Sequence, residues 1–393
     1  MSSAAVNRGT SLYLHVPFCA SSCDFCAFYQ EQPKRADLER YLAGVERELA
    51  LDPPGRVETV FWGGGTPGLL PAEDLARLGR AVTDAAGRPE EWTVELAPSS
   101  VRADELAALK EAGVTRVSLG VQSFDAATLE ALGRRHSPKQ VEEAWALIES
   151  AGFASRNLDL MFAIPGQDMA LWEATLDEAL GLGTEHLSCY EVIYEDDTPL
   201  FEQLKAGEID VDEELACAQY ERLVERAQAA GFRQYEVANF ARDARPGALP
   251  PRPLPEIPAL ACRHNVAYWR GLDFFGLGPS ASEYVDGVRS RNRASTVLYT
   301  EQALRGHRAK EFAEALPPLA RAGELAAFGL RMNAGWPFQA FHELTGFDLR
   351  DGWAADIASL ADQGWAEVLP DRLRLTPQGL RFADEAARRM LRS

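Results

Sequence analysis

The 393-residue chain is 46% hydrophobic and 25% charged, which is enough apolar material for a large core without disulfides. Its 40 Lys and Arg against 59 Asp and Glu give a net charge of −19, which argues against nonspecific binding to nucleic acid or anionic lipid. No segment contains a run of about 18 uncharged apolar residues, as a membrane span requires, and residues 1–10 lack the apolar stretch of a secretory signal. We therefore expect a cytoplasmic protein.

Along the first 240 residues, runs of β-branched and aromatic residues alternate with amphipathic stretches. The runs predict strands, and the amphipathic stretches predict helices, several of which end near a glycine suited to a C-cap. The predicted strands are 11–16, 57–62, 92–96, 116–122, 157–164, 186–192 and 234–240, and the predicted helices are 72–86, 103–112, 138–151, 171–182 and 212–230. This alternation predicts parallel strands with functional groups at their carboxyl ends.

The pattern changes after this first predicted domain, 1–240. Six prolines fall between residues 242 and 261, which predicts a stiff loop over 241–262. A connecting region, 263–300, and a small C-terminal domain, 301–393, are predicted to follow. A helix over 351–364, strands over 365–375 and a closing helix are typical of a winged helix. Because no basic recognition helix is present, a structural or substrate-covering role is favoured over DNA binding.

Three cysteines follow the first predicted strand directly. Cys19, Cys23 and Cys26 have the spacing C-x3-C-x2-C, and the other three cysteines are scattered. This pattern indicates a reducing compartment and metal binding rather than disulfides or buried structural thiols. A structural zinc site needs a fourth ligand, which His15 could supply only awkwardly. Because four cysteines normally complete a 4Fe-4S cluster, three predict a cluster with one iron open to another ligand.

This cysteine loop, with Phe25 just before its last cysteine, resembles the signature of the radical-SAM superfamily. The resemblance implies an α/β fold: a partial (β/α)6 barrel, here followed by the small α+β winged-helix-like domain. It also implies that the open iron binds the amino and carboxylate groups of S-adenosylmethionine (SAM). An electron from the reduced cluster then cleaves SAM to a 5′-deoxyadenosyl radical.

A glycine run at residues 63–65 follows the second predicted strand and precedes Thr66 and Pro67. Alone, such a run most often marks a tight turn. Glycines also let backbone N–H groups approach a ligand closely. In the radical-SAM context, Gly64, Gly65 and Thr66 resemble the motif that holds the methionyl part of the cofactor.

Isolated polar residues interrupt three further apolar strands, namely Glu95, Gln122 and Asp159. Buried polar groups need partners, which neighbouring backbone or a ligand at the strand ends could supply. Together with Arg134, and with Tyr13 beside the cysteines, they resemble cofactor-binding positions in the branch that contains coproporphyrinogen dehydrogenases and haem chaperones.

The resemblance to this branch covers nearly the whole chain, with some departures. Arg135 adjoins Arg134 and could take its role. Ala97 stands where the branch usually has Asn in Glu-x-Asn-Pro, which removes an amide near the cofactor. Dehydrogenases of the branch resemble one another in a fourth cysteine, where this chain has Phe28, and in a long N-terminal extension, whereas only 18 residues precede Cys19.

The segment from Cys262 to Trp269 resembles the haem-binding motif H-N-x-x-Y-W of the branch. His264 or Cys262 could ligate haem iron, and Tyr268 and Trp269 offer apolar faces to a porphyrin. Alternatively, His264 and Asn265 cap a turn while the two aromatic residues pack in the core.

Two hypotheses follow from the resemblance. The favoured one is a haem chaperone that transfers haem to acceptor haemoproteins, which could be membrane-bound, with the 4Fe-4S cluster and SAM in a supporting role. The alternative is an enzyme of porphyrin biosynthesis, an oxygen-independent coproporphyrinogen III dehydrogenase. Radical chemistry on another substrate also remains open. Under all three we expect no binding to nucleic acid.

Overall fold

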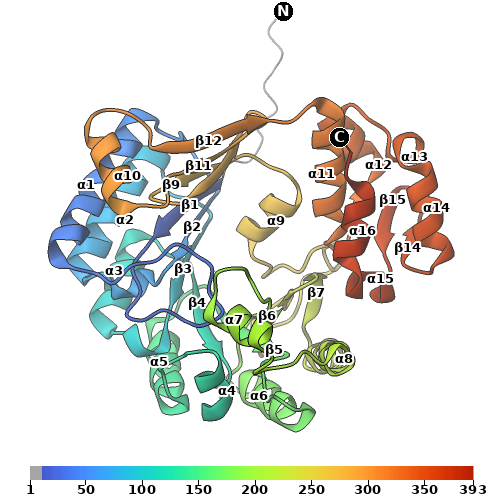
Figure 1. Cartoon of the computed structure of the whole chain (residues 1–393), viewed down its shortest axis with the longest axis horizontal. Helices are drawn as coiled ribbons and strands as arrows, with labels where there is room; N and C mark the ends of the chain where they lie inside the picture. Colours follow the sequence, from blue (N-terminus) through green and yellow to red (C-terminus); the bar gives the residue numbers. More distant parts are fainter. Residues whose placement is uncertain (1–10, 393) are drawn as a thin grey trace, which may run out of the picture.

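The computed structural model describes residues 11–392, and its centre is a curved sheet of parallel strands (Figure 1). Strands β1 to β6 run parallel, each paired with the next along the chain. They are β1 (Ser11–Val16), β2 (Thr59–Gly64), β3 (Glu91–Leu96), β4 (Arg116–Gln122), β5 (Ser155–Phe162) and β6 (His186–Glu191). The predicted parallel α/β barrel is confirmed.

Helices lie between these strands in the sequence and cover mainly the outer face of the sheet. They are α1 (Arg35–Leu51), α2 (Ala72–Ala86), α3 (Ala103–Ala112), α4 (Ala126–Ala131), α5 (Pro138–Ala151), α6 (Met169–Gly181), α7 (Pro199–Ala206) and α8 (Glu213–Ala229). Alternate strand residues, such as Leu12 and Leu14, are buried in one large core. Because successive side chains of a strand point to opposite faces, Tyr13 and its equivalents face the inner side of the barrel.

The sheet extends beyond the six parallel strands on both sides. On one side, β9 (Phe274–Leu277) pairs parallel with β1 and continues into the antiparallel strands β10 (Ser282–Val285), β11 (Val288–Asn292) and β12 (Lys310–Ala315). Helix α10 (Thr296–Leu304) lies between the last two in sequence and contacts α1. The sequence did not predict these short strands.

On the other side, the single strand predicted over 234–240 is wrong. Two antiparallel strands, β7 (Arg233–Glu236) and β8 (Asn239–Ala241), occupy this segment, and β8 pairs with β6. The carboxylate of Glu236 accepts a hydrogen bond from the backbone N–H of Ala238 at 3.1 Å. This contact stabilises the turn that reverses the chain.

The C-terminal part has its own core, which contains Trp336, Phe341 and Trp353. Its elements are α11 (Pro318–Leu330), β13 (Trp336–Pro337), α12 (Phe338–Thr345), α13 (Leu349–Gly352), α14 (Ala354–Asp362), β14 (Ala366–Val368), β15 (Arg372–Leu375), α15 (Pro377–Arg381) and α16 (Ala383–Met390). Strands β14 and β15 form the hairpin predicted between the two helices. The predicted small α+β domain is therefore present.

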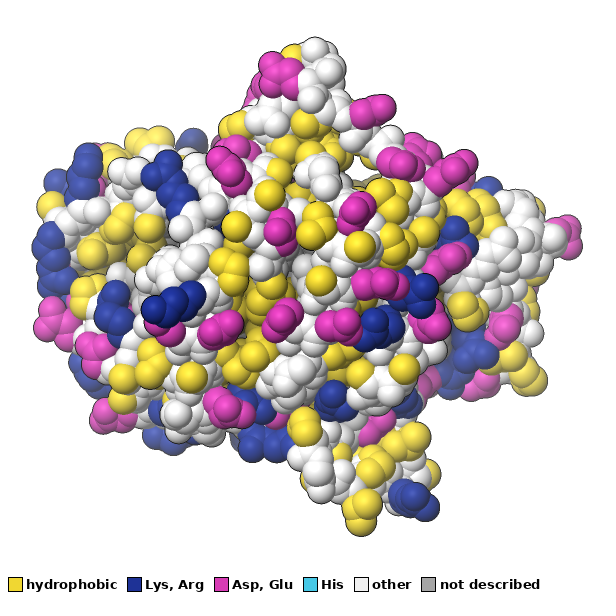
Figure 2. Space-filling view, turned by 90° about the horizontal axis from the view of Figure 1, so that it is seen from below, with side chains coloured by type: hydrophobic (Ala, Val, Ile, Leu, Met, Phe, Trp, Pro, Cys, Tyr) yellow, Lys and Arg dark blue, Asp and Glu magenta, His cyan; other side chains and the backbone are white. Residues whose placement is uncertain are grey.

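Between β8 and α9 (Arg263–Trp269), the proline-rich loop has no helix or strand, and Leu249 in it is 91% exposed. Within the described residues, no helix is both long enough and apolar enough to cross a membrane. Figure 2 shows acidic and basic side chains interspersed over one face of the molecule rather than gathered into a basic patch.

Candidate functional site

The cysteine loop leaves β1 and crosses the carboxyl ends of the parallel strands. At its base, the backbone N–H of Cys19 donates to the carbonyl of Glu31 at 3.0 Å. At its far side, Asp24 bonds through its backbone to Leu132 after α4, at 3.0 Å, and to Leu200 of α7, at 2.9 Å. The loop is therefore fastened on both sides of the barrel mouth.

The three predicted cluster cysteines are all half-buried on this loop. Burial raises the pKa of Cys19 to about 11, and the neighbouring Cys26 and Cys23 contribute to this rise. Burial also raises the pKa of Cys26. Within residues 11–392, no three His, Cys, Asp or Glu side chains converge tightly enough to hold a single metal ion. A 4Fe-4S cluster does not need such convergence, because each cysteine binds a different iron.

The glycine run beside this loop is required by close packing of the protein on itself. A Cβ atom on Gly64, whose φ is +98°, would lie 2.3 Å from the His15 ring, and one on Gly65 would lie 2.6 Å from the carbonyl oxygen of Phe18. Thr66 follows, with its Oγ1 3.8 Å from the Sγ of Cys19. The run thus brings the end of β2 against the cysteine loop.

Two carboxyl groups, Glu95 and Asp159, face the inside of the barrel near its mouth. The backbone N–H of Gly64 donates to Glu95 Oε2 at 3.3 Å. Burial, followed by the charge of Asp159, raises the pKa of Glu95 to about 8, and burial raises the pKa of Asp159. Two neighbouring carboxyl groups do not readily both become negatively charged in a buried site. A positively charged ligand would offset this repulsion, so the pair suits a cationic ligand.

The inner side of the barrel keeps contact with solvent. Tyr190 of β6 is 42% exposed, although the surrounding protein desolvates its hydroxyl enough to raise its pKa. Tyr13, Glu95 and Asp159 are all half-buried on the same inner face. A small molecule that enters the mouth could therefore reach both carboxyl groups.

His15, which the sequence offered only as an awkward zinc ligand, positions Tyr13. Its Nε2 lies 2.9 Å from the backbone carbonyl of Tyr29 and must carry the hydrogen, because a carbonyl only accepts. In the neutral ring, Nδ1 then accepts from the hydroxyl of Tyr13 at 3.1 Å. Burial lowers the pKa of His15, which favours this neutral form.

Gln122 and Arg134 also lie near the mouth. Gln122 has a φ of 65° at a register shift between β4 and β5, a conformation that non-glycine residues adopt at a cost. The guanidinium of Arg134 lies 5.7 Å from the Phe25 ring centroid, and its Nε is buried without a hydrogen-bond partner. Arg135, the alternative to Arg134, is exposed.

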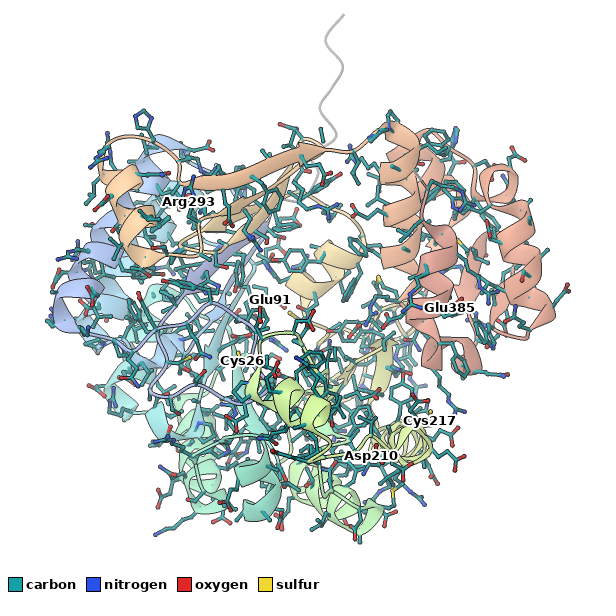
Figure 3. The ribbon with its side chains drawn as sticks, in the orientation of Figure 1. Cys26, Glu91, Asp210, Cys217, Arg293 and Glu385 are labelled. Carbon is teal, nitrogen blue, oxygen red and sulfur yellow. The ribbon has the colours of Figure 1, made fainter. Side chains whose placement is uncertain are left out.

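The haem-motif residues lie at the opposite end of the barrel from the cysteines. The ring of His264 in α9 is 2.9 Å from Thr59, the first residue of β2. Glu91, the first residue of β3, accepts hydrogen bonds from the backbone N–H groups of Arg263 and His264, both at 3.0 Å. In Figure 3, Glu91 lies beside α9 and Cys26 lies farther from that helix.

These haem-motif residues are largely buried against one another and the barrel. His264 is 1% exposed, and burial, followed by the charge of Arg116, lowers its pKa to about 3. Burial raises the pKa of Cys262 to about 12. Tyr268 packs edge-on against His264, at 4.7 Å between ring centroids, whereas Trp269 faces Phe328 of α11. Asn265 is half-buried.

Sequence reasoning missed Glu91 and Thr59, which hold α9. A buried acid at the start of an apolar strand was the available signal for Glu91. Nothing in the sequence linked it to a helix about 170 residues later.

Residues 13–179 match the Radical SAM superfamily, and residues 316–382 match the HemN C-terminal domain. The barrel and the cysteine loop thus define a radical-SAM protein. "Heme chaperone HemW" of Bacillus subtilis is 31% identical over 384 residues, which cover 95% of this chain and 97% of that protein. "Heme chaperone HemW" of Mycobacterium tuberculosis is 33% identical over 400 residues, covering 97% and 94%. The chain belongs to the HemW family of radical-SAM proteins.

Two further similarities extend over almost the whole chain. The mitochondrial "Radical S-adenosyl methionine domain-containing protein 1" of Bos taurus is 33% identical over 404 residues, covering 98% of this chain and 87% of that protein. The solved coproporphyrinogen III oxidase (HemN) of Escherichia coli has the same fold, with a TM-score of 0.82 at 22% identity. The alignment covers 98% of this chain and 90% of HemN.

Proposed function

We propose that this protein is a haem chaperone, which binds haem and transfers it to acceptor haemoproteins, and that it carries a SAM-bound 4Fe-4S cluster. The observation that carries the proposal is the similarity to "Heme chaperone HemW" proteins over 95% and more of the chain. Phe28, which is 67% exposed, stands where the resemblance to dehydrogenases implies a fourth cysteine. The protein therefore lacks a residue expected of the enzymes.

Cys19, Cys23 and Cys26 are the proposed ligands of the cluster. The three half-buried thiols interact electrostatically with one another on a loop fixed at both ends, which fits a single shared centre. When bound, the cluster supplies one-electron reduction of SAM.

The proposed SAM site lies beside the cluster. Glu95 and Asp159 attract the positive charges of SAM, and the segment of Gly64, Gly65 and Thr66 forms the wall next to the cysteines. Gln122, Arg134 and Tyr13 complete the site. Their positions around the mouth support this assignment.

For haem, we propose His264 as the iron ligand through Nε2, which is buried without a hydrogen-bond partner. Because His264 is 1% exposed, α9 has to move away from Glu91 before the imidazole can reach iron. Cys262, with its raised pKa, is a poorer ligand as a thiol. Asn265, Tyr268 and Trp269 would move with the helix and contact the porphyrin.

We place this activity in the cytoplasm, with acceptors that include membrane-bound haemoproteins and with no nucleic-acid partner. The net charge of −19 supports a transient encounter with a protein rather than adsorption to anionic lipid. Contact with a membrane would then pass through the acceptor.

The deciding experiment is anaerobic haem titration of the cluster-reconstituted protein, followed by visible absorption. We expect about one haem per chain and weaker binding or an altered spectrum in His264→Ala, whereas His342→Ala, at an exposed position, should behave as wild type. Absence of haem binding by the wild type would overturn the chaperone proposal.

The competing proposal is a coproporphyrinogen III dehydrogenase, which the shared fold with HemN favours. In the same preparation, coproporphyrinogen III, SAM and a reductant are incubated anaerobically and the porphyrins are analysed. Stoichiometric decarboxylation would establish the enzyme. We expect none, because Phe28 stands where the resemblance implies the fourth cysteine of the dehydrogenases.

A further inference from the structure

A chain of buried hydrogen bonds leads to Asp159 from the far side of the barrel. Asp159 Oδ2 accepts from the hydroxyl of Ser118 at 2.8 Å, and Oδ1 accepts from Nδ2 of Asn157 at 2.8 Å. Asn157 Oδ1 lies 2.6 Å from Nδ1 of His186, whose Nε2 lies 2.9 Å from the hydroxyl of Tyr235. The four partners are all buried on β4, β5, β6 and β7.

The chemistry of these groups fixes the direction of every bond. A carboxylate only accepts, so the amide nitrogen of Asn157 faces Asp159 and its oxygen faces His186. His186 must then carry its hydrogen on Nδ1. Burial, followed by the charge of Arg116, lowers the pKa of His186, so the ring is neutral and Nε2 accepts from Tyr235. Along the chain, each residue thus donates to the neighbour that is nearer to Asp159.

The far end of this chain lies next to the haem-motif helix. Tyr235 packs in a small cluster with Ala241, Ala261 and Val266, and Val266 belongs to α9. The hydroxyl of Tyr235 is hydrogen-bonded to His186, which is the first residue of β6. The bonds therefore run from the α9 end of the barrel toward the mouth.

We infer that Tyr235, His186 and Asn157 form a positioning relay that holds the Asp159 carboxylate in the orientation needed to bind SAM. The inference rests on the proposed role of Asp159 in the SAM site. The relay residues are positioning residues, since they act through Asp159. A carboxylate with two fixed donors keeps its remaining lone pairs toward the inside of the barrel, where a cationic ligand meets them without reorganisation.

The test is equilibrium binding of SAM to the full-length, cluster-reconstituted protein by anaerobic calorimetry. Tyr235→Phe removes the terminal donor and allows His186 to exchange its hydrogen between the two ring nitrogens. We expect Tyr235→Phe and His186→Leu each to weaken SAM binding about tenfold. His186→Asn should retain most of the affinity, because its amide nitrogen can occupy the place of Nδ1. Tyr299→Phe is the matched control: it deletes another buried hydroxyl, bonded to Glu48 at 2.7 Å, outside the relay.

To distinguish the relay from a merely structural role of these residues, the substitutions are repeated in an Asp159→Ala background. If the relay acts through Asp159, Tyr235→Phe has no further effect there. Equal weakening with and without Asp159, or wild-type affinity in both Tyr235→Phe and His186→Leu, would overturn the relay. If His186→Leu does not fold, Tyr235→Phe decides. Wild-type protein that holds its cluster but does not bind SAM would instead refute the proposed cofactor site, and the relay with it.

Discussion

The carboxylate of Glu91 accepts a hydrogen bond from the backbone N–H of His264 at 3.0 Å, which fastens the first turn of α9 to the first residue of β3. Glu91→Ala removes this cap. We expect the free energy of unfolding to fall by about 1–2 kcal/mol, as for loss of a helix cap. We also expect haem to bind faster, because α9 leaves the barrel more easily. Urea denaturation and stopped-flow absorption measure the two effects.

The control for Glu91 is its neighbour Glu90, which is exposed and forms a surface ion pair with Arg263. Glu90→Ala should change the stability by less than about 1 kcal/mol and leave the haem association rate unchanged. Equal rates in the two variants would show that release of α9 does not limit haem binding.

The cluster assignment separates the six cysteines into two groups. Alanine at Cys19, Cys23 or Cys26 should abolish most of the iron and sulfide content after reconstitution, because each provides the only protein ligand of one iron. Cys217→Ala, at a half-buried site on α8, should retain both. Iron analysis and visible absorption provide the measurement, and a full cluster in Cys23→Ala would contradict the assignment.

Gly64 combines a left-handed backbone with a crowded site. Gly64→Ala places a methyl group against the His15 ring, and we expect a loss of at least about 3 kcal/mol, from the φ of +98° and from the collision. Gly152→Ala, with a left-handed backbone of φ +67° and ψ 44° and open space around it, isolates the backbone cost, which is about 1–2 kcal/mol. Thermal unfolding compares the stability of the two variants. Equal losses of stability would mean that the His15 ring moves aside at no measurable cost.

Buried His264 predicts a dependence of stability on pH. Its pKa is about 3 in the folded protein, against about 6.5 in an unfolded chain. As the pH falls, His264 is therefore protonated first in the unfolded state. Its contribution to the free energy of unfolding is complete above its pKa in the unfolded chain and is lost as the pH falls toward its pKa in the folded protein. His264→Asn should make the decline between about pH 6 and pH 4 shallower by up to about 1.4 kcal/mol per pH unit.

Denaturant titrations at several pH values test this decline, with exposed His307→Asn as the control. Parallel curves for wild type and His264→Asn would contradict it. His136 and His186 also have lowered pKa values, so part of the slope should survive in His264→Asn.

The barrel could be predicted because its strands and helices are regular. The bounds of β1, β4, α2, α3 and α5 agree with the sequence pattern to the residue. Helix α1 was missed although Leu38, Leu42, Val45 and Leu49 have helical spacing, because its C-cap is Asp52 rather than a glycine, as in α2, α3 and α5. Strands β10 to β12 were missed because charged residues interrupt their apolar positions, and β9 because it is only 4 residues long and contains a glycine.

The cysteine loop and the polar strand ends were found from sequence because a parallel barrel brings the carboxyl ends of its strands together. The roles of these residues, and the domain boundaries drawn from composition, stay predictions. The place of α9 could not be foreseen. It depends on contacts of Glu91 and Thr59 with residues more than 170 positions away, which leave no local pattern.

The haem-motif helix and the proposed SAM site are joined by aromatic contacts on the inner face of the barrel. The ring centroid of His264 lies 5.3 Å from that of Phe61, which in turn lies 6.4 Å from that of Tyr13. Release of α9 for haem binding would therefore uncover Phe61 beside Tyr13, so the two proposed ligands would bind to neighbouring surfaces rather than to separate compartments.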